Sequence, residues 1–387
     1  MNWLSDFRGY PVGERATRLM LAAAAVSAMV MGMAGMGAGA AAADTVIDTI
    51  PVGTSPDGVA VSPSGSRAYV ANSIDATVSV IDTFTNVVVD TIAVGNGPRG
   101  LAVNPDGSRV YVANATDNTV SVIDTATNAL VDTVAVGITP VAVAVSPLGS
   151  RVYVTDRSDG TVSVIDTATN AVVDTIAVGN GPRGLAVNRL GSRVYVTNRT
   201  DGTVSVIDAF ANTVVDTIAV GNNPDGVAVS PFGFRVYVAN RIDGTVSVID
   251  TFTNTVVDTI AVGTTPSGVA LSPDGSRVYV TIVNDDTVSV IDTFTNTTAD
   301  TIPVGDAPRR VAVKPDGSRV YVTLGGDGAV SVIAVERCLG SLCIGTGSFA
   351  GSLAGAGSGT GTGSSGAGSL TGTGSLAGGG LTGSTSS

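Results

Sequence analysis

The sequence of 387 residues contains no histidine, and its only cysteines are Cys338 and Cys343. Without histidine the chain lacks the side chain that most often serves as a general base, a nucleophile relay or a haem ligand. Two cysteines without histidine supply half of a tetrahedral zinc site, so we expect no zinc centre. Lysine occurs only at Lys314, and glutamate only at Glu14 and Glu336.

Charged residues are also scarce, at 13% of the chain, and the acidic ones are almost all aspartate. The formal net charge is −12 and the sequence pI is about 4.3. Nucleic acids and anionic membrane surfaces both require a basic face on the protein, so we expect neither as a partner. Hydrophobic residues make up 44% of the sequence, which is enough to form a sizeable core.

The N-terminal segment has the layout of a secretory signal peptide. Three arginines precede residue 19, an apolar run rich in Ala and Met follows, and alanines at 41–43 offer a cleavage site before Asp44. We therefore predict that residues 1–43 are removed and that the protein is secreted or associated with the cell envelope. The alternative is an uncleaved membrane anchor, because the apolar run is about 25 residues long. Its many Gly and Ala residues favour cleavage, after which no membrane insertion is expected.

The C-terminal segment, residues 338–387, consists mostly of Gly, Ser, Thr, Ala and Leu and has no charged side chain. Such a composition buries too little apolar surface to offset its ordering entropy, so it predicts a flexible tail. The tail is either a plain linker or a tether through a cell envelope. Cys338 and Cys343 at its start suggest a small disulfide loop in an exported protein, with free thiols as the alternative.

Between these ends the sequence repeats every 42 residues without insertion or deletion. The motif Arg-(Val/Ala)-Tyr-Val recurs with its tyrosines at Tyr69, Tyr111, Tyr153, Tyr195, Tyr237, Tyr279 and Tyr321. Each unit holds four short segments rich in Val, Ile, Thr and Tyr, separated by Gly, Pro, Asn and Asp, and nothing indicates a helix. Four strands per unit at this period predict an all-β fold, a seven-bladed β-propeller over residues 44–337.

The order of the strands predicts how the ring closes. Residues 44–53 are a copy of the strand that the last repeat lacks after Ile333, so we expect them to complete the last blade. The Gly-Val-Ala-Val strand should be innermost, with its central alanines where the blades crowd the axis. The loops that precede each inner strand and the Asp turns that follow each Tyr strand should then share one rim.

The stretch Val194-Tyr195-Val196-Thr197-Asn198 spells the signature of the YVTN-repeat β-propellers, and the resemblance covers residues 44–335. It implies a secreted or surface-layer seven-bladed propeller, distantly similar to the lactonase-type propellers. Those lactonase-type propellers rely on His or Glu around the channel, and these residues are absent from the repeats here. The resemblance is therefore informative about the fold and poor for function.

Two sets of charged residues recur at the 42-residue interval of the repeat, so each should form a ring in the folded protein. An arginine stands two residues before every tyrosine; six of these should face an aspartate across a hairpin, as Arg67 faces Asp82, whereas Arg319 faces Ala334. An anion-binding ring is the alternative. A second ring, of aspartates, has the chemistry of hairpin turns, with calcium binding as the alternative. Its members are Asp75, Asp117, Asp159, Asp201, Asp243, Asp285 and Asp327.

Residues that differ from one repeat to the next are better candidates for a binding site, because residues needed only for the fold should be the same in every blade. The position before the inner-strand glycine carries Asp57, Arg99, Val141, Arg183, Asp225, Ser267 and Arg309 in successive repeats. Arg310 replaces the glycine itself in the last repeat. On the same rim Arg157, Arg199 and Arg241 follow three consecutive Tyr strands. These arginines predict a basic mouth over the channel that binds an anionic or polar ligand, such as a carbohydrate acid or a partner's carboxylates. Solvated loop charges are the alternative.

The sequence thus favours a monomeric, non-catalytic binding module without a cofactor, whose protein or carbohydrate ligand it does not identify. A structural component of the envelope is a close variant. The alternative function is a lactonase-like hydrolase that uses Asp57 or Asp225 with a bound metal.

Overall fold

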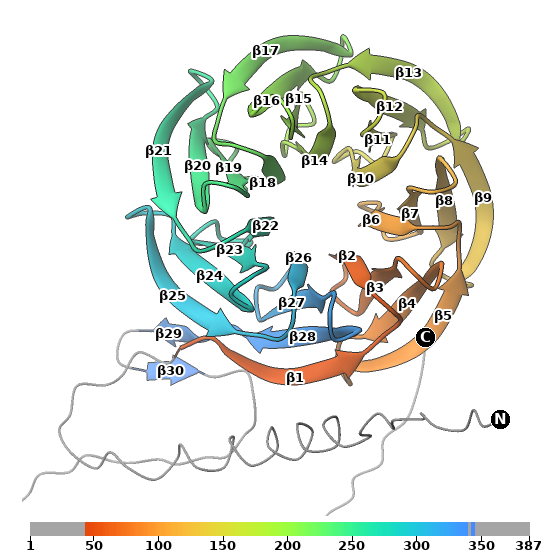
Figure 1. Cartoon of the computed structure of the whole chain (residues 1–387). Coiled ribbons are helices and arrows are strands. Elements are labelled where there is room, and N and C mark those ends of the chain that lie inside the picture. The colour runs from red at the N-terminus through yellow and green to blue at the C-terminus, as the bar shows by residue number, and fades with distance from the viewer. Residues whose placement is uncertain (1–42, 340–341, 345–387) are drawn as a thin grey trace, which may run out of the picture. The chain divides into compact units, whose positions relative to one another are not determined.

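The computed structural model describes residues 43–339 and 342–344. This part of the chain forms seven four-stranded antiparallel sheets, arranged around a central axis as the blades of a β-propeller (Figure 1). The prediction of an all-β, seven-bladed fold is confirmed. Within the described ranges no helix is long and apolar enough to cross a membrane.

The strands of a blade follow one another from the axis outwards. Blade 1 comprises β2 (Pro56–Val61), β3 (Arg67–Asn72), β4 (Thr77–Asp82) and β5 (Val87–Ala93). Blade 2 comprises β6 (Pro98–Val103), β7 (Arg109–Asn114), β8 (Thr119–Asp124) and β9 (Ala129–Ala135). Blade 3 comprises β10 (Pro140–Val145), β11 (Arg151–Asp156), β12 (Thr161–Asp166) and β13 (Ala171–Ala177). Blade 4 comprises β14 (Pro182–Val187), β15 (Arg193–Asn198), β16 (Thr203–Asp208) and β17 (Thr213–Ala219).

The remaining blades repeat this arrangement, except that the last one takes its outer strand from the N-terminal side of the chain. Blade 5 comprises β18 (Pro224–Val229), β19 (Arg235–Asn240), β20 (Thr245–Asp250) and β21 (Thr255–Ala261). Blade 6 comprises β22 (Pro266–Leu271), β23 (Arg277–Ile282), β24 (Thr287–Asp292) and β25 (Thr297–Pro303). Blade 7 comprises β26 (Pro308–Val313), β27 (Arg319–Leu324), β28 (Ala329–Ala334) and β1 (Thr45–Pro51). A short hairpin of β29 (Arg337–Leu339) and β30 (Leu342–Ile344) follows.

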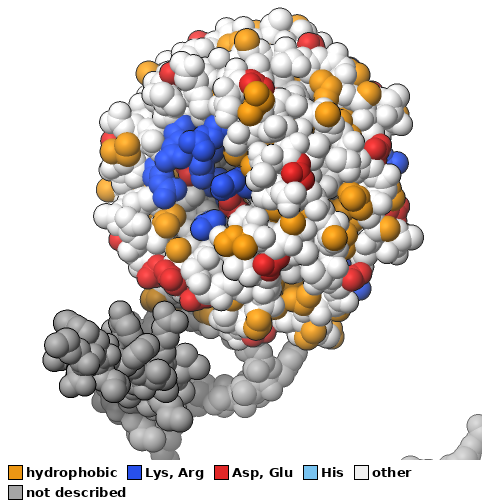
Figure 2. Space-filling model, turned by 45° about the vertical axis from the view of Figure 1, so that its right-hand side comes forward, with side chains coloured by type: hydrophobic (Ala, Val, Ile, Leu, Met, Phe, Trp, Pro, Cys, Tyr) orange, Lys and Arg blue, Asp and Glu red, His pale blue; other side chains and the backbone are white. Residues whose placement is uncertain are grey.

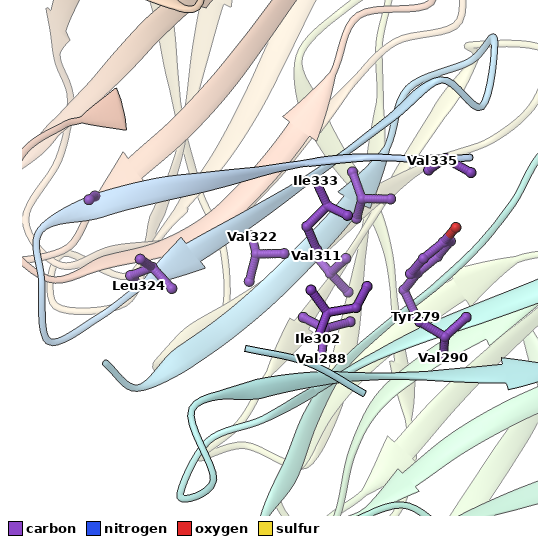
Figure 3. Packing of buried hydrophobic residues seen from close by; sticks show 11 residues of the cluster. Tyr279, Val288, Val290, Ile302, Val311, Val322, Leu324, Ile333 and Val335 are labelled. Atoms are coloured by element: carbon purple, nitrogen blue, oxygen red, sulfur yellow. The ribbon is translucent and has the colours of Figure 1, made fainter. Parts of the chain in front are cut away.

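The core lies between neighbouring blades. Every tyrosine of the repeat is buried, and each packs against valines of the next blade. Figure 3 shows the cluster between blades 6 and 7, where Tyr279, Val288 and Val290 face Val322 and Ile333. Because the blades are covered on both faces, the two middle strands of each blade are buried along almost their whole length rather than at alternate residues.

Neighbouring inner strands approach closely at the glycine that most inner strands carry, in addition to the alanine that we expected. A Cβ atom on Gly184 would lie 2.3 Å from the carbonyl oxygen of Asp225 in the next blade. The alanine two residues later, Ala186, packs into the cluster of Tyr195 between blades 4 and 5. The absence of a side chain at Gly184 therefore lets the inner strands of blades 4 and 5 approach each other near the axis.

The N-terminal strand closes the ring as predicted. β1 pairs antiparallel with β28, from Thr45 opposite Ala334 to Pro51 opposite Ala329. The buried carboxylate of Asp44, just before β1, accepts bonds from Nη1 of Arg277 at 2.8 Å and from the Tyr279 hydroxyl at 3.1 Å. The first residues of the ring are therefore fixed to blade 6 as well as to blade 7.

The arginines of the Tyr strands form only part of the expected ion pairs. All six lie opposite the predicted aspartates in register. Ion pairs form at Arg67–Asp82, Arg193–Asp208 and Arg235–Asp250. Arg109 instead donates to Asn170 of the next blade at 3.2 Å, and Arg277 pairs with Asp44. These side chains are long enough to bridge blades, so the ring of arginines serves the scaffold in two ways.

The structure describes little of the two ends of the chain. The signal peptide at 1–43 and the tail at 338–387 lie almost entirely outside the described residues. The backbones of Cys338 and Cys343 face each other in the β29–β30 hairpin, but the disulfide itself falls outside what the structure describes.

Candidate functional site

Two sets of loops share one rim of the ring, which we call the first rim. They are the loops before each inner strand and the turns after each Tyr strand, and backbone hydrogen bonds join them. For example, Arg241 N donates to Asn223 O at 3.1 Å, and Arg199 N donates to Gly181 O at 3.1 Å. The turns at 62–66 and 83–86, with their counterparts in other blades, form the opposite second rim.

The residues that break the repeat gather at the centre of the first rim, around a cavity of about 310 Å³ that we call the arginine cavity. Its polar lining consists of Asp57, Arg99, Arg183, Arg241, Ser267 and Arg309. Figure 2 shows basic side chains gathered around a hollow on one face, with acidic atoms visible beneath them. Residues from blades 1, 2, 4, 5, 6 and 7 therefore meet at this mouth.

Asp225 lies below the arginine cavity and its side chain is completely buried. Its Oδ1 accepts from Nε of Arg183 at 2.8 Å and from Nη2 of Arg310 at 3.0 Å. Nη1 of Arg241 lies 3.5 Å from Oδ2. Burial raises the pKa of Asp225, but the charges of Arg310 and Arg183 outweigh burial and hold this pKa below its usual range. The carboxylate is thus ionised and anchors arginines from three blades.

Arg310 stands where most other blades have glycine, and its side chain crosses the end of the central channel. From blade 7 it reaches Asp225 in blade 5 and donates to Ser267 Oγ in blade 6 at 3.1 Å. Its Nε lies 3.9 Å from Asp57 in blade 1. Burial lowers the pKa of Arg310, yet Asp225 and Asp57 outweigh it and raise this pKa. Arg310 itself lines the smaller cavity of the central channel, and its partners Asp57 and Ser267 line the arginine cavity, so its side chain lies between the two.

The remaining arginines of the cavity are less constrained. Arg99 pairs with the buried Asp57 at 3.1 Å, but its own side chain is 40% exposed. Arg309 lies over the backbone of Gly325 and makes no ion pair within the described part of the chain. Because Asp57 and Asp225 are matched by several guanidinium groups, the mouth keeps an excess of positive charge that faces the cavity.

A second cavity, of about 530 Å³, adjoins the first, and we call it the outer cavity. Its polar and apolar lining includes Arg199, Asn223, Arg241, Ile242, Asp243, Thr264 and Thr265. Arg241 belongs to both cavities. Nε of Arg199 donates to Asn223 Oδ1 at 2.5 Å. The pKa of Arg199 is lowered mainly by burial and, to a smaller extent, by the neighbouring positive charge of Arg183.

The sequence pointed to Arg199 and Arg241 but missed the rest of the outer cavity. Asn223 and Thr265 occupy loop positions with counterparts in every blade, so no break in the repeat marks them. Their positive φ angles, 61° and 65°, are shared with other loop residues of the rim. Arg157 lines neither cavity; it is an exposed residue whose charge contributes to the lowered pKa of Arg199.

The ring of aspartates on this rim is used by the scaffold. Each carboxylate accepts a hydrogen bond from a backbone N–H of the loop before the inner strand, as Asp201 does from Asn180 at 2.7 Å. The backbone and side-chain bonds from Asn180 lower the pKa of Asp201. Among the described residues no three His, Cys, Asp or Glu side chains are grouped so that they could hold a metal ion.

Comparison with known proteins agrees with this architecture. Part of the chain matches a family of propellers. Residues 83–215 match the family described as "Lactonase, 7-bladed beta-propeller", from the end of blade 1 into the outer strand of blade 4. Among solved structures, the chain is similar to one from Kuenenia stuttgartiensis Hydrazine Synthase, with a TM-score of 0.67 and 23% identity. That similarity covers 78% of this chain and 99% of the other, and it shows the fold alone. A comparison with curated proteins finds no match.

Proposed function

We propose that this propeller is a non-catalytic binding module, exported from the cell and acting as a monomer at the cell surface or outside it. The arginine cavity is its binding site, and the ligand presents a carboxylate or another anionic group. The observation that carries the proposal is the gathering of four arginines, each from a different blade, around one cavity of about 310 Å³. This volume lies within the usual range for small-ligand pockets, about 300–1,000 Å³.

The buried carboxylates prepare the arginines for binding. Asp225 fixes Arg183 from below, and Asp57 contacts Arg99, so part of the ordering cost of these long side chains is met before a ligand arrives. Arginine suits the task because its planar fork bonds both oxygens of a carboxylate. Because the protein as a whole carries a net charge of −12, the local excess of positive charge attracts anions to this rim rather than to the rest of the surface.

Export rests on the sequence of residues 1–43 and on the position of Asp44. Cleavage after Ala43 would make Asp44 the first residue of the mature chain, and its side chain is held by Arg277 and Tyr279. N-terminal sequencing of the protein recovered outside the cell should begin at Asp44. Recovery of the intact chain in the membrane fraction would instead support the anchor.

The second candidate function is a lactonase-like hydrolase, which the family match over residues 83–215 favours. In this reading Asp57 or Asp225 would hold a metal at the mouth of the channel. Both carboxylates already accept bonds from arginines, so a metal would have to displace Arg99 from Asp57, or Arg183 and Arg310 from Asp225. Turnover of lactones that depends on calcium and is lost in the Asp57→Asn variant would establish the hydrolase.

An array of acidic and neutral glycans, peptides and small carboxylic acids tests the binding module. We expect the wild-type protein to retain acidic members only, and retention to fall as salt screens the charges. The double variant R241Q/R309Q should lose this retention, while R151Q/R189Q, which removes two arginines from the second rim, should keep it. Retention of neutral members, or equal retention by both double variants, would contradict the proposal.

A further inference from the structure

Positive charge is distributed unevenly between the two cavities that share Arg241. The arginine cavity has four arginines in its lining against Asp57 alone. The outer cavity has Arg199 and Arg241 against Asp243, and its other polar groups are neutral. An anionic group therefore gains most in the arginine cavity, whereas the outer cavity suits a neutral polar group.

The groups of the outer cavity match hydroxyls. Asn223 uses Oδ1 to accept from Arg199, which leaves its amide N–H groups to donate to a ligand. Thr264 donates its hydroxyl proton to Asp285, so its oxygen remains able to accept. Ile242, which is 72% exposed, adds an apolar surface beside these groups. A sugar ring offers hydroxyls that both donate and accept, together with apolar C–H faces.

We propose that the ligand is an oligosaccharide that ends in one acidic sugar, with the carboxylate in the arginine cavity and the adjoining neutral sugar in the outer cavity. This inference rests on the proposed function and specifies its ligand. Arg241, at the boundary of the two cavities, contacts both sugars.

The same geometry disfavours a run of consecutive acidic units, whether an acidic peptide or a polyuronate. The second acidic unit would enter the outer cavity, where Asp243 carries a negative charge. Asp243 cannot turn away freely, because it accepts from Asn222 N at 2.7 Å and from Asn222 Nδ2 at 2.9 Å. Repulsion from this fixed carboxylate would offset part of the attraction of Arg199.

The test is a calorimetric titration of the full-length protein with glucuronyl-galactose, glucuronate, digalacturonate, digalactose, triglutamate and citrate. We expect glucuronyl-galactose to bind about tenfold more tightly than glucuronate, a difference of about 1.4 kcal/mol, and also more tightly than digalacturonate or triglutamate. Digalactose should not bind measurably.

The variant I242S, which removes the apolar surface from the outer cavity, should lower the affinity for glucuronyl-galactose and leave the affinity for glucuronate unchanged. Ile74 occupies the same position in blade 1 with 71% exposure and lines neither cavity, so I74S is the matched control and should bind as the wild type does. The inference would be overturned if the two variants had equal effects, or if digalacturonate or triglutamate bound more tightly than glucuronyl-galactose. Citrate binding in either case would still support the anion site. Failure of every anion to bind, citrate included, would overturn the proposed function as well.

Discussion

Nη2 of Arg310 in blade 7 donates to Oδ1 of Asp225 in blade 5 at 3.0 Å, so this ion pair joins two blades that are not neighbours in the ring. Both residues break the 42-residue repeat, and both are largely removed from solvent. The pair therefore has two roles: it joins blades across the axis of the ring, and it contacts Arg183, Arg241 and Ser267, which line the arginine cavity.

This relationship predicts measurable coupling between the two residues. R310G restores the glycine of the repeat and should lower the free energy of unfolding by about 1–3 kcal/mol. This loss is smaller than when a buried charge loses its only partner, because Asp225 still pairs with Arg183. In a cycle with D225N and the double variant, denaturant unfolding should give a coupling energy of about 1–3 kcal/mol. Additive effects of the two changes would show that the contact contributes nothing.

Closure of the ring predicts a strong dependence on the N-terminal strand. Deletion of residues 44–53 removes every contact of β1 with β28, including the burial of Ile50. We expect the melting temperature to fall by about 10 °C or more, since about 5 kcal/mol corresponds to such a shift in a domain of this size.

The variant D44N separates the anchoring contact from the strand. It keeps β1 but weakens the bonds to Arg277 and Tyr279, so its melting temperature should lie between those of the wild type and the deletion. If the deletion melts within a few degrees of the wild type, the closure does not stabilise the ring.

Asp156 predicts a pH dependence that the sequence did not suggest. It occupies the buried last position of the Tyr strand, where blades 1, 2, 4 and 5 have Asn, and burial raises its pKa from 3.8 to about 6. The folded state then binds a proton that the unfolded state releases, so the contribution of Asp156 to stability is fully present below about pH 4 and is lost as pH rises through about 6. The loss at pH 7 is about 2–3 kcal/mol, from about 1.4 kcal/mol per pH unit.

Urea unfolding from pH 4 to pH 7 checks this dependence. D156N should be more stable than the wild type at pH 7 and should lose the decline between pH 4 and pH 6. The reverse change in blade 4, N198D, places a carboxyl in the equivalent site and should introduce a similar decline. Parallel pH profiles for the wild type and D156N would disprove the assignment.

The aspartate ring predicts that calcium has little effect on stability. The carboxylates are engaged by backbone N–H groups, as Asp117 is by Asn96 at 2.7 Å and Asp285 by Thr264 at 2.9 Å. The melting temperature should therefore stay the same when a chelator and then excess calcium are added. A rise of several degrees with calcium would show that these carboxylates bind the ion instead.

The sequence was sufficient for the fold because the same short pattern recurs at a fixed interval, which specifies strands, turns and the number of blades together. It also singled out Asp57, Arg99, Arg183, Arg241 and Arg309, which line the arginine cavity, because departures are visible in a ring whose scaffold positions repeat. It did not show that Asp225 is buried beneath Arg183, because that depends on how side chains from separate blades converge.

The outer cavity could not be predicted for a related reason. Asn223 and Thr264 look like ordinary loop residues, and only their placement beside Arg241 distinguishes them from their counterparts. Likewise, Arg109 and Asp124 face each other in register as expected, yet the guanidinium of Arg109 bonds to Asn170 in the next blade. Register follows from sequence, whereas the direction of a long side chain follows from its neighbours in space.

Calorimetric titration of citrate into the wild type, R309Q and R189Q at low salt tests directly whether the arginine cavity binds anions. Arg309 lines the arginine cavity and has no ion pair with any described residue, so R309Q removes one arginine from the lining and leaves the Arg310–Asp225 pair intact. R189Q removes an exposed arginine of the second rim. We expect R309Q to weaken citrate binding by about tenfold, for a contact of about 1.4 kcal/mol, and R189Q to bind citrate as the wild type does. Equal affinity of all three proteins, or no binding to the wild type, would contradict anion binding by the arginine cavity.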